Sequence, residues 1–380
     1  MQSWTKVGIL LAGFIYAQEE GSPLRLIVYD ELFDRFFQIR SWTTTSLTTR
    51  PDTVLYLRAS GNLPPLERFT HLQALHLSEI EEIDLQALTR QIRRYCPKLK
   101  ALALEDCEIT DLSPLAELSL QGILLDGNPL TDLSPLLRLA DLQFLSLART
   151  PIQDISPLAQ ISSLQALDLS ETAIRDLTPL RSLSRLRMLA LFRCTAIEDF
   201  SPLLVHSQLE LLNISHTRPE AARKMLIQIG LFPRLRVLQA QGIIQESASL
   251  AALGTLTEME ELTLGQNAAI RDLSFVRLLR KLLYLDIHHC SVPDLSPLAG
   301  LPYLVKLSVG KNRVTSLAPL IQCPRLAYLY CYENPIQDWE KLLEMPALTY
   351  VMLSRKDLPP ERLQALVSRL RKKGVMVDAP

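Results

Sequence analysis

The sequence lacks the segments that would place a chain of this length in a membrane or on nucleic acid. No run reaches the roughly 18 to 20 uncharged apolar residues that a membrane-spanning helix needs. The 40 basic residues are balanced by 41 acidic ones, for a formal net charge of -1, so there is no long-range field to attract nucleic acid or an anionic surface. We therefore expect no membrane span, no nucleic-acid partner, and a partner chosen by local surface.

Catalytic and cofactor motifs are missing as well. There is no Cys-x-x-Cys pair, no glycine-rich phosphate loop and no His-Glu-x-x-His zinc motif. His288, His289 and Cys290 are adjacent, but alternation along a strand points neighbouring side chains to opposite sides and separates them as ligands. No spacing of Ser, His and Asp assembles a catalytic triad. We expect no catalytic residues, no metal, no cofactor and no enzymatic activity.

One phrase, Leu-x-x-Leu-x-Leu-x-x-(Asn/Thr/Cys), recurs thirteen times between Leu72 and Leu348, at steps of 21 to 27 residues. A unit this short cannot bury its own apolar residues, so each repeat must pack on its neighbours. Two leucines of the phrase flank a single residue, and period-two alternation turns both inward. This predicts an α/β solenoid: a leucine-rich repeat horseshoe with a parallel concave β-sheet and short helical turns on its convex side.

The return path of each repeat carries a second motif, Asp-Leu-Ser-Pro-Leu, as at 111–115 and 132–136. We expect the Ser or Thr side chain to cap a helical turn and Pro to occupy its first position. Two repeats are longer than the others and their apolar residues have helical spacing. They predict full α-helices at 84–95 and 219–230 on the convex side.

Both ends of the chain depart from the repeat, as the caps of a solenoid should. Residues 1–60 are rich in aromatic residues and predict an N-terminal cap, with a small separate interaction module as the alternative. The repeat solenoid would then occupy 61–356. An apolar helical stripe ending near Gly374 predicts a C-terminal helical cap at 357–380.

Cysteine placement bears on the cellular compartment. Cys107, Cys194 and Cys290 occupy the inward Asn/Thr slot of repeats that are four apart. Strands of a sheet lie about 4.8 Å apart, so these thiols would be about 20 Å from each other, far beyond the reach of a disulfide. We expect six buried free thiols, as in a reducing compartment, and hence a cytoplasmic protein. The segment at 1–17 resembles a short secretory signal and makes secretion the alternative.

The phrase Leu-x-x-Leu-x-Leu-x-x-Thr-x-Ile-x-Asp-Leu-Ser-Pro-Leu resembles bacterial leucine-rich repeat proteins of the internalin type, and the resemblance covers 72–353. In that family the concave sheet binds protein ligands, often host receptors. The resemblance therefore implies a recognition or adaptor role here. The phosphatase-regulating leucine-rich proteins of the eukaryotic nucleus are similar in repeat length.

The concave surface can be read from the third, fifth, seventh and eighth residues of each phrase, which should point outward. In the C-terminal repeats these positions hold Tyr, the residue type that often dominates interface energetics. The predicted partner-binding residues there are Tyr284, Asp286, His288, Lys306, Tyr328, Tyr330, Tyr332 and Tyr350. A second, weaker patch in the middle repeats comprises Phe144, Arg149, Phe192 and Arg193. Alternatively, the strand-favouring tyrosines cover the end of the sheet and pack on Trp339 or the cap.

Two classes of function follow from these expectations. The first is a monomeric, non-enzymatic recognition module or adaptor that binds one protein partner on its concave face. The second is a secreted or delivered bacterial effector, similar to an adhesin, that binds a host or competitor protein. A third possibility is a scaffold whose partner binds the predicted convex helices.

Overall fold

Most candidate residues lie on or directly after short strands, many of which are only three residues long. The computed structural model describes residues 43–44, 56–61, 63, 65–246 and 250–379. The chain divides into two compact units, 1–197 (unit 1) and 198–380 (unit 2). The signal-like segment at 1–17 lies outside the described residues, as does most of the aromatic region at 1–60.

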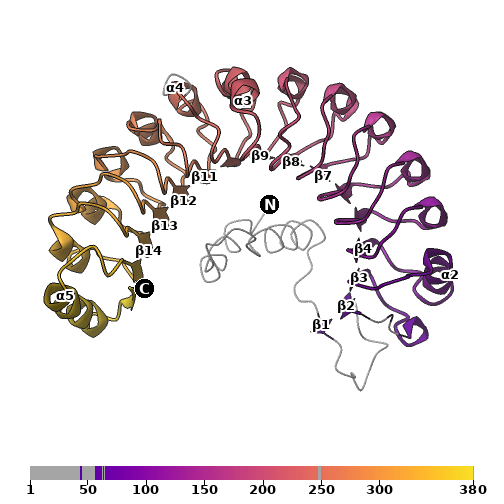
Figure 1. Ribbon diagram of the computed structural model, residues 1–380, viewed down its shortest axis with the longest axis horizontal. Helices are drawn as coiled ribbons and strands as arrows, with labels where there is room; N and C mark the ends of the chain where they lie inside the picture. The colour runs from indigo at the N-terminus through magenta and orange to yellow at the C-terminus, as the bar shows by residue number, and fades with distance from the viewer. Residues whose placement is uncertain (1–42, 45–55, 62, 64, 247–249, 380) are drawn as a thin grey trace. The chain divides into compact units, whose positions relative to one another are not determined.

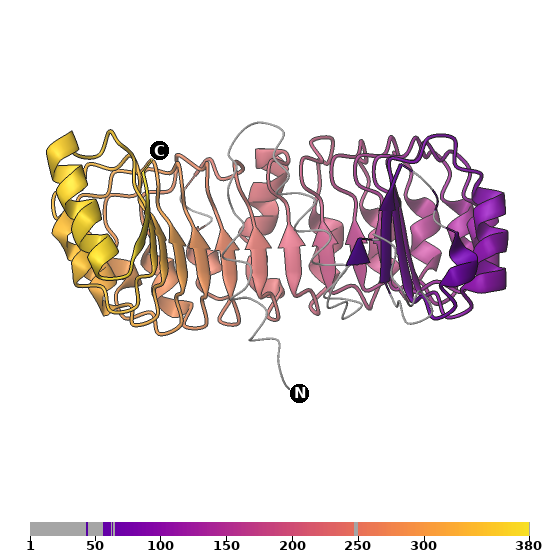
Figure 2. The ribbon, with the colours of Figure 1, turned by 90° about the horizontal axis from the view of Figure 1, so that it is seen from below.

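In unit 1 every strand pairs in parallel with the next one along the chain, so that Leu145 stands beside Leu167. Figure 1 shows the strands on the inner side of the unit and the helical turns on its outer side, and Figure 2 shows the strands edge to edge. The strands are β1 (Thr43–Thr44), β2 (Tyr56–Ser60), β3 (Ala74–Ser78), β4 (Ala101–Glu105), β5 (Gly122–Leu124), β6 (Phe144–Ser146), β7 (Ala166–Asp168) and β8 (Met188–Ala190).

Unit 2 repeats this arrangement, and Leu285 stands beside Leu307 in the same way. Its strands are β9 (Leu211–Asn213), β10 (Val237–Gln239), β11 (Glu261–Thr263), β12 (Tyr284–Asp286), β13 (Lys306–Ser308), β14 (Tyr328–Tyr330), β15 (Tyr350–Met352) and β16 (Met376–Asp378). The predicted α/β leucine-rich repeat fold, with a parallel sheet on one side and helical turns on the other, is confirmed.

The outer turns are 3-10 helices, and the way they are capped corrects the sequence interpretation. In the Asp-Leu-Ser-Pro-Leu motif Ser is the first residue of the turn, and the carboxylate two residues earlier accepts its backbone N–H, at 2.8 Å between Ser113 N and Asp111 Oδ1. The Ser side chain was expected to cap, but its own N–H is one of the donors that need a cap. The turns are η3 (Leu66–Arg68), η4 (Ser113–Glu117), η5 (Ser134–Arg138), η6 (Ser156–Gln160), η7 (Thr178–Ser182), η8 (Ser201–Val205), η9 (Ile229–Leu231), η11 (Ser274–Leu278), η12 (Ser296–Leu298), η13 (Ala318–Gln322) and η14 (Trp339–Leu343).

Among the described residues, four α-helices interrupt this pattern. The helix predicted at 84–95 is α2 (Leu85–Tyr95), which Asp84 caps by accepting the N–H of Ala87. The helix predicted at 219–230 is shorter than expected, because α3 (Pro219–Leu226) ends before the 3-10 turn η9. The others are α4 (Leu250–Leu253) and α5 (Pro360–Lys372). In the described part of the chain, no helix is both long and apolar enough to cross a membrane.

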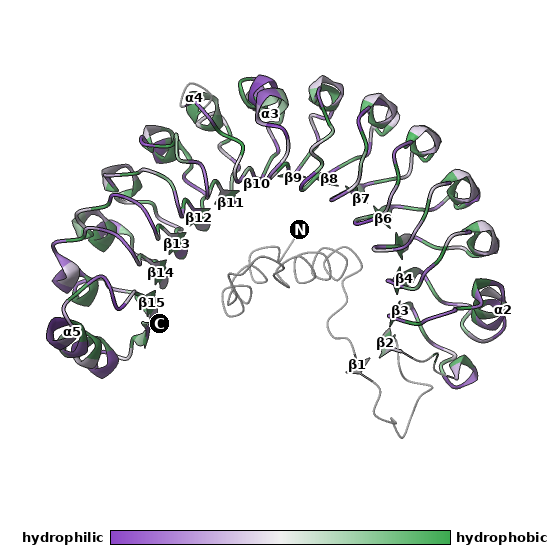
Figure 3. Ribbon diagram, in the orientation of Figure 1, coloured by the Kyte–Doolittle hydropathy of each residue, from purple (hydrophilic) through white to green (hydrophobic). Residues whose placement is uncertain are grey.

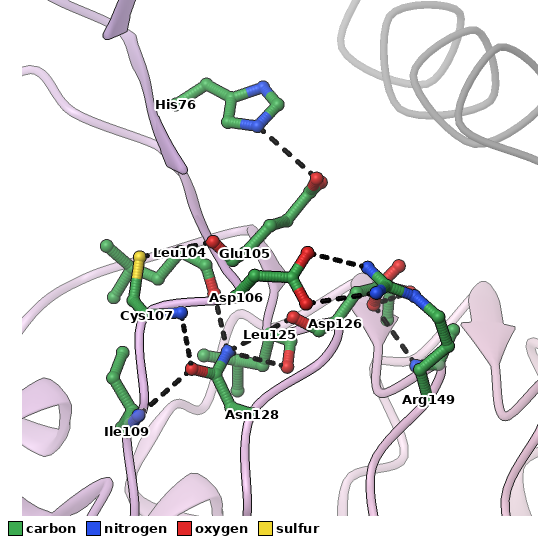
Figure 4. Close-up of polar contacts among 12 residues, drawn as sticks. His76, Leu104, Glu105, Asp106, Cys107, Ile109, Leu125, Asp126, Asn128 and Arg149 are labelled. Carbon is green, nitrogen blue, oxygen red and sulfur yellow. Dashed lines mark hydrogen bonds and ion pairs between the residues drawn. The ribbon is translucent and has the colours of Figure 1, made fainter. Parts of the chain in front are cut away.

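The core of each unit lies between the strands and the turns, and Figure 3 shows hydrophobic and hydrophilic residues alternating within every repeat. The inward Asn of a repeat closes its turn: Asn128 donates to the carbonyls of Leu104 and Leu125 and accepts from the N–H groups of Cys107 and Ile109 (Figure 4). All six cysteines are buried and free, as predicted.

Candidate functional site

The strand itself is shorter than the sequence interpretation assumed. In most repeats it covers only the third to fifth residues of the phrase, as in β12. The eighth residue was expected to be an outward strand position, but it has a left-handed backbone, with φ between 51° and 60°, at every non-glycine example except Arg355 of the last phrase. It therefore lies in the turn after the strand. These residues are Glu79, Asp106, Arg149, Glu171, Arg193, His216, Gln266, His289, Lys311 and Glu333.

Four of the predicted contact residues are buried although they belong to the inner face of the sheet. Phe144 is 2 % exposed, Asp286 5 %, Lys306 6 % and Tyr330 8 %. The other members of the unit 2 set, Tyr284, His288, Tyr328, Tyr332 and Tyr350, are half-buried.

The residues at the third position of four successive phrases form one row across neighbouring strands of unit 2. Tyr284 stands beside Lys306, Lys306 beside Tyr328, and Tyr328 beside Tyr350. Tyr330, two residues after Tyr328 in β14, lies with its ring centroid 5.4 Å from that of Tyr350, and the Tyr328 and Tyr350 centroids are 6.3 Å apart. Burial raises the pKa of Tyr330 and of Tyr350 to about 12, so both hydroxyls stay protonated and can donate hydrogen bonds at neutral pH.

Lys306 lies at the centre of this row. Its ammonium is 4.6 Å from the Tyr284 ring centroid and 5.3 Å from that of Tyr330, the range in which a ring face attracts a cation. Burial lowers its pKa to about 8, although the negative charges of Asp286 and Glu261 oppose the shift. We call Tyr284, Lys306, Tyr328, Tyr330 and Tyr350 the Lys306 cluster.

Two carboxylates adjoin this row: Glu261 stands beside Tyr284 in the sheet, and Asp286, which acts more strongly on Lys306, is bonded by other groups. Asp286 Oδ1 lies 2.8 Å from His288 Nδ1, and Gln241 Nε2 donates to Asp286 Oδ2 at 3.2 Å. Burial opposes the charged state of both partners, but their hydrogen bond and mutual attraction lower the pKa of Asp286 and raise that of His288. Within the described residues, Lys306 forms no ion pair with Asp286 or with any other carboxylate.

The adjacent His288, His289 and Cys290 are held apart by these contacts. Cys290 Sγ donates to the Leu264 carbonyl at 3.4 Å, on the core side, whereas His288 bonds Asp286. His289 occupies the left-handed turn. Across the described ranges, no group of three or more His, Cys, Asp or Glu residues has the geometry to hold a metal ion.

The middle-repeat patch of unit 1 is divided among separate contacts. Both guanidinium nitrogens of Arg149 bond Asp106 at 2.9 Å, a contact between turns two repeats apart (Figure 4). The Arg193 guanidinium lies 5.1 Å above the Phe192 ring. The charge of Arg149 is thus matched within the chain, because the bidentate pair sets its guanidinium against the Asp106 carboxylate.

A line of polar contacts lies beside this patch, at positions of the phrase that were expected to point outward. Ser146 Oγ donates to Asp126, and Asp168 Oδ2 lies 3.5 Å from the same hydroxyl. Burial, followed by the charges of Asp168 and Glu105, raises the pKa of Asp126 well above its usual range. These residues occupy the fifth and seventh positions of their phrases, so the phrase itself indicates that they lie near one another.

No protein-family model matches the sequence, and no curated protein matches it. Solved structures do resemble the chain. A leucine-rich repeat protein of Leptospira interrogans aligns with a TM-score of 0.60 and 20 % identity over 90 % of this chain and 100 % of the other. The internalin InlF of Listeria monocytogenes aligns with a TM-score of 0.51 and 22 % identity, over 85 % and 94 %.

A plant protein shows the same likeness. The ectodomain of the membrane receptor kinase GASSHO1/SCHENGEN3 from Arabidopsis thaliana, solved in complex with CASPARIAN STRIP INTEGRITY FACTOR 2, has a TM-score of 0.56 and 16 % identity over 85 % of this chain and 43 % of the receptor chain. At these identities the likeness concerns the fold. The expected resemblance to internalin-type leucine-rich repeat proteins is confirmed at that level.

Proposed function

We propose that unit 2 recognises a protein partner through the Lys306 cluster, on the inner face of its sheet, and catalyses no reaction. The observation that carries the proposal is the Lys306 ammonium, which lies against the rings of Tyr284 and Tyr330, while Asp286, the carboxylate that acts most strongly on it, bonds other groups. A buried ammonium of this kind would be stabilised by a hydrogen bond to an acidic side chain or a backbone carbonyl of a protein partner.

The surroundings of Lys306 suit a protein ligand. Tyrosine rings bury a large apolar area at little cost in conformational entropy, and their hydroxyls supply directional hydrogen bonds. Tyr328 and Tyr350 stand in adjacent register positions and form one continuous aromatic surface. Residues of this type, close to a desolvated charge, are the usual centre of a protein interface.

Nucleic acid fits this surface less well. Binding a phosphate backbone requires several cations along one track. Here a single buried lysine has Asp286 and Glu261 as its charged neighbours, and the whole chain has a net charge of -1.

Affinity capture with a matched pair of variants tests the proposal. The test variant combines Tyr328→Ala and Tyr350→Ala, two half-buried members of the cluster, and leaves Tyr330 intact because it is 8 % exposed. The control is Tyr303→Ala, a tyrosine that is 44 % exposed and stacks on Arg325 outside the cluster. We expect a specific protein to be captured by the wild type and the control and lost with the double variant. Equal capture by a folded double variant would show that the cluster is not the binding site.

The cellular setting is part of the same proposal. A monomeric cytoplasmic adaptor is our first candidate, because six free thiols suit a reducing compartment. The second is an exported bacterial factor, which the signal-like residues at 1–17 and the fold shared with an internalin favour. Sequencing the mature N-terminus separates them: retention of Met1 supports the adaptor, and cleavage near Ala17 supports export.

A further inference from the structure

A row of exposed apolar side chains runs along the outer side of unit 2, on the turns that lie opposite the strands. Val205, Leu231 and Leu278 are the last residues of η8, η9 and η11, and they are 50 %, 49 % and 60 % exposed. Ile227, directly after α3, is 53 % exposed. A single exposed leucine needs no explanation, but the same exposure at one position of several repeats does.

The repeat itself does not require an apolar residue at this position. In unit 1 the last residue of four successive turns is polar: Glu117, Arg138, Gln160 and Ser182. All four are exposed. The turns of unit 1 fold with polar residues at this position. Folding therefore does not explain the apolar residues of unit 2.

Two glycines make the row continuous. A Cβ placed on Gly254 would lie 3.1 Å from Leu278 Cδ1, and one on Gly230 would lie 2.9 Å from Thr255 Oγ1. Each side chain thus leans over a glycine of the preceding repeat, and α4 packs against both η9 and η11. The strip formed by Val205, Ile227, Leu231, Thr255 and Leu278 is called the outer strip below.

The charges that accompany the outer strip are basic. Exposed cations follow or precede its apolar residues in the sequence, and within the described part of the chain none of them forms an ion pair. They are Lys224, Arg234, Arg277 and Arg280. Of the neighbouring carboxylates, Glu246 pairs with Arg223 at 3.1 Å and Glu258 with Lys281 at 2.6 Å. Asp199 and Asp272 cap their own turns and are attracted by Lys224 and Arg277, which leaves Arg234 and Arg280 as the cations available to a partner.

We propose that the outer strip is a second docking surface, and that it binds an amphipathic helical segment of a protein partner with an apolar face and acidic margins. The apolar residues would supply the buried area, and Arg234 and Arg280 would supply the charge complementarity. A second copy of this chain fits poorly, because pairing two such strips brings their cations together. An anionic membrane fits poorly too, since it would also meet the neighbouring ion-paired carboxylates.

Designed peptides provide the probe. One peptide of about 18 residues, five helical turns, presents a leucine face with glutamates along both margins, and its counterpart replaces every glutamate with lysine. Fluorescence anisotropy of each labelled peptide is measured against the full chain. The test variant combines Val205→Ser, Leu231→Ser and Leu278→Ser, and the control is Leu137→Ser, an outer-turn leucine of unit 1 that is 39 % exposed. A charge variant, Arg234→Glu with Arg280→Glu, keeps the apolar residues.

We expect the glutamate peptide to bind the wild type and the control equally, and the serine variant at least about tenfold more weakly. The charge variant should lose the glutamate peptide and gain the lysine peptide, a reversal that misfolding cannot produce. Three results would overturn the proposal: equal binding to the serine variant, strip-dependent self-association of the wild type in sedimentation, or strip-dependent binding to phosphatidylserine vesicles in place of the peptide.

Discussion

The ring of Tyr332 occupies the space above Gly310 of the preceding repeat: a Cβ on this glycine would lie 2.5 Å from both Cε1 and Cζ of the tyrosine. The same relationship joins Gly265 and His288, where a Cβ would come within 2.3 Å of His288 Nδ1. Glycine and a large ring therefore alternate at the seventh position of successive phrases. The absence of a side chain in one repeat sets the orientation of the next ring along the inner face.

Substituting Gly310→Ala should move the Tyr332 ring and weaken partner binding without unfolding unit 2. The free energy of unfolding should change by less than about 1 kcal/mol, because the far end of a side chain can swing away from the new methyl group. Binding to the captured partner by Gly310→Ala, by Tyr332→Ala and by the double variant checks this. If the effects act through the ring, the double variant loses no more than Tyr332→Ala alone; additive losses would show that Gly310 acts separately.

Replacing Lys306 with Met should stabilise the isolated protein and weaken partner binding. Burial lowers the pKa of Lys306 to about 8, whereas an ordinary lysine has a pKa of 10.5. Below pH 8 the buried ammonium is charged, and this lowers the free energy of unfolding. Denaturant unfolding at pH 7 should show a gain of about 1 to 2 kcal/mol for Lys306→Met, after the lost cation–π contacts are subtracted.

The stability difference between Lys306→Met and the wild type should depend on pH. Between pH 8 and 10.5 the unfolded chain binds more protons at Lys306 than the folded chain, so the stability of the wild type rises with pH and the advantage of Met shrinks. A variant that is less stable than the wild type at pH 7 would contradict the assignment of Lys306 as a poorly compensated buried charge.

The pair formed by Asp286 and His288 should be most stabilising in mildly acidic solution. The pKa of His288 is raised above 6.5, so its contribution is complete below that pH and is lost as the pH rises through the folded value. The pKa of Asp286 is lowered below 3.8, so its contribution is complete above that pH and is lost as the pH falls further. In an NMR titration Asp286→Asn should lower the pKa of His288; an unchanged pKa would mean that the two side chains are not paired in solution.

The carboxylates that cap the outer turns should each contribute a small, pH-dependent stability. Asp199 Oδ1 accepts the N–H of Ser201 at 2.9 Å, and hydrogen bonds from Ser201 lower the pKa of Asp199. Asp199→Ala should lower the free energy of unfolding by about 0.5 to 1 kcal/mol near neutral pH, with the loss disappearing as the wild-type carboxylate is protonated. Gln322→Ala, at an exposed outer-turn residue, is the control, and an equal loss there would argue against the cap.

Much of the fold could be predicted because the repeat phrase states it many times. Leu145 and Leu167 are inward in register for the same reason that every other repeat places its leucines inward, and one pattern fixes them all. The caps of the turns were mistaken because Asp and Ser are both good capping residues, and only the position where the turn begins decides between them. The end of α3 before η9 was missed because apolar spacing does not distinguish the last helical turn from a 3-10 turn.

Less of the candidate site could be predicted from the sequence. Alternation correctly gathered Tyr284, Lys306 and Tyr328 on one face, since residues at one phrase position become neighbours in the sheet. Their burial and the lack of a carboxylate partner for Lys306 depend on side-chain directions that a pattern does not contain. Arg149 appeared available for a partner, but its pair with Asp106 joins turns whose closeness follows only from the left-handed backbone at both residues.

Site-specific photocrosslinking tests the central claim most directly. A photoreactive phenylalanine analogue is placed at Tyr328, on the inner face of unit 2, and in a second version at Gln322, at the end of η13 on the outer side. Both versions are irradiated in cells of the source organism. We predict one protein adduct from position 328, lost when Lys306→Met is added, and no such adduct from position 322. An adduct from position 322 alone, or the same adduct from both positions, would contradict recognition through the Lys306 cluster.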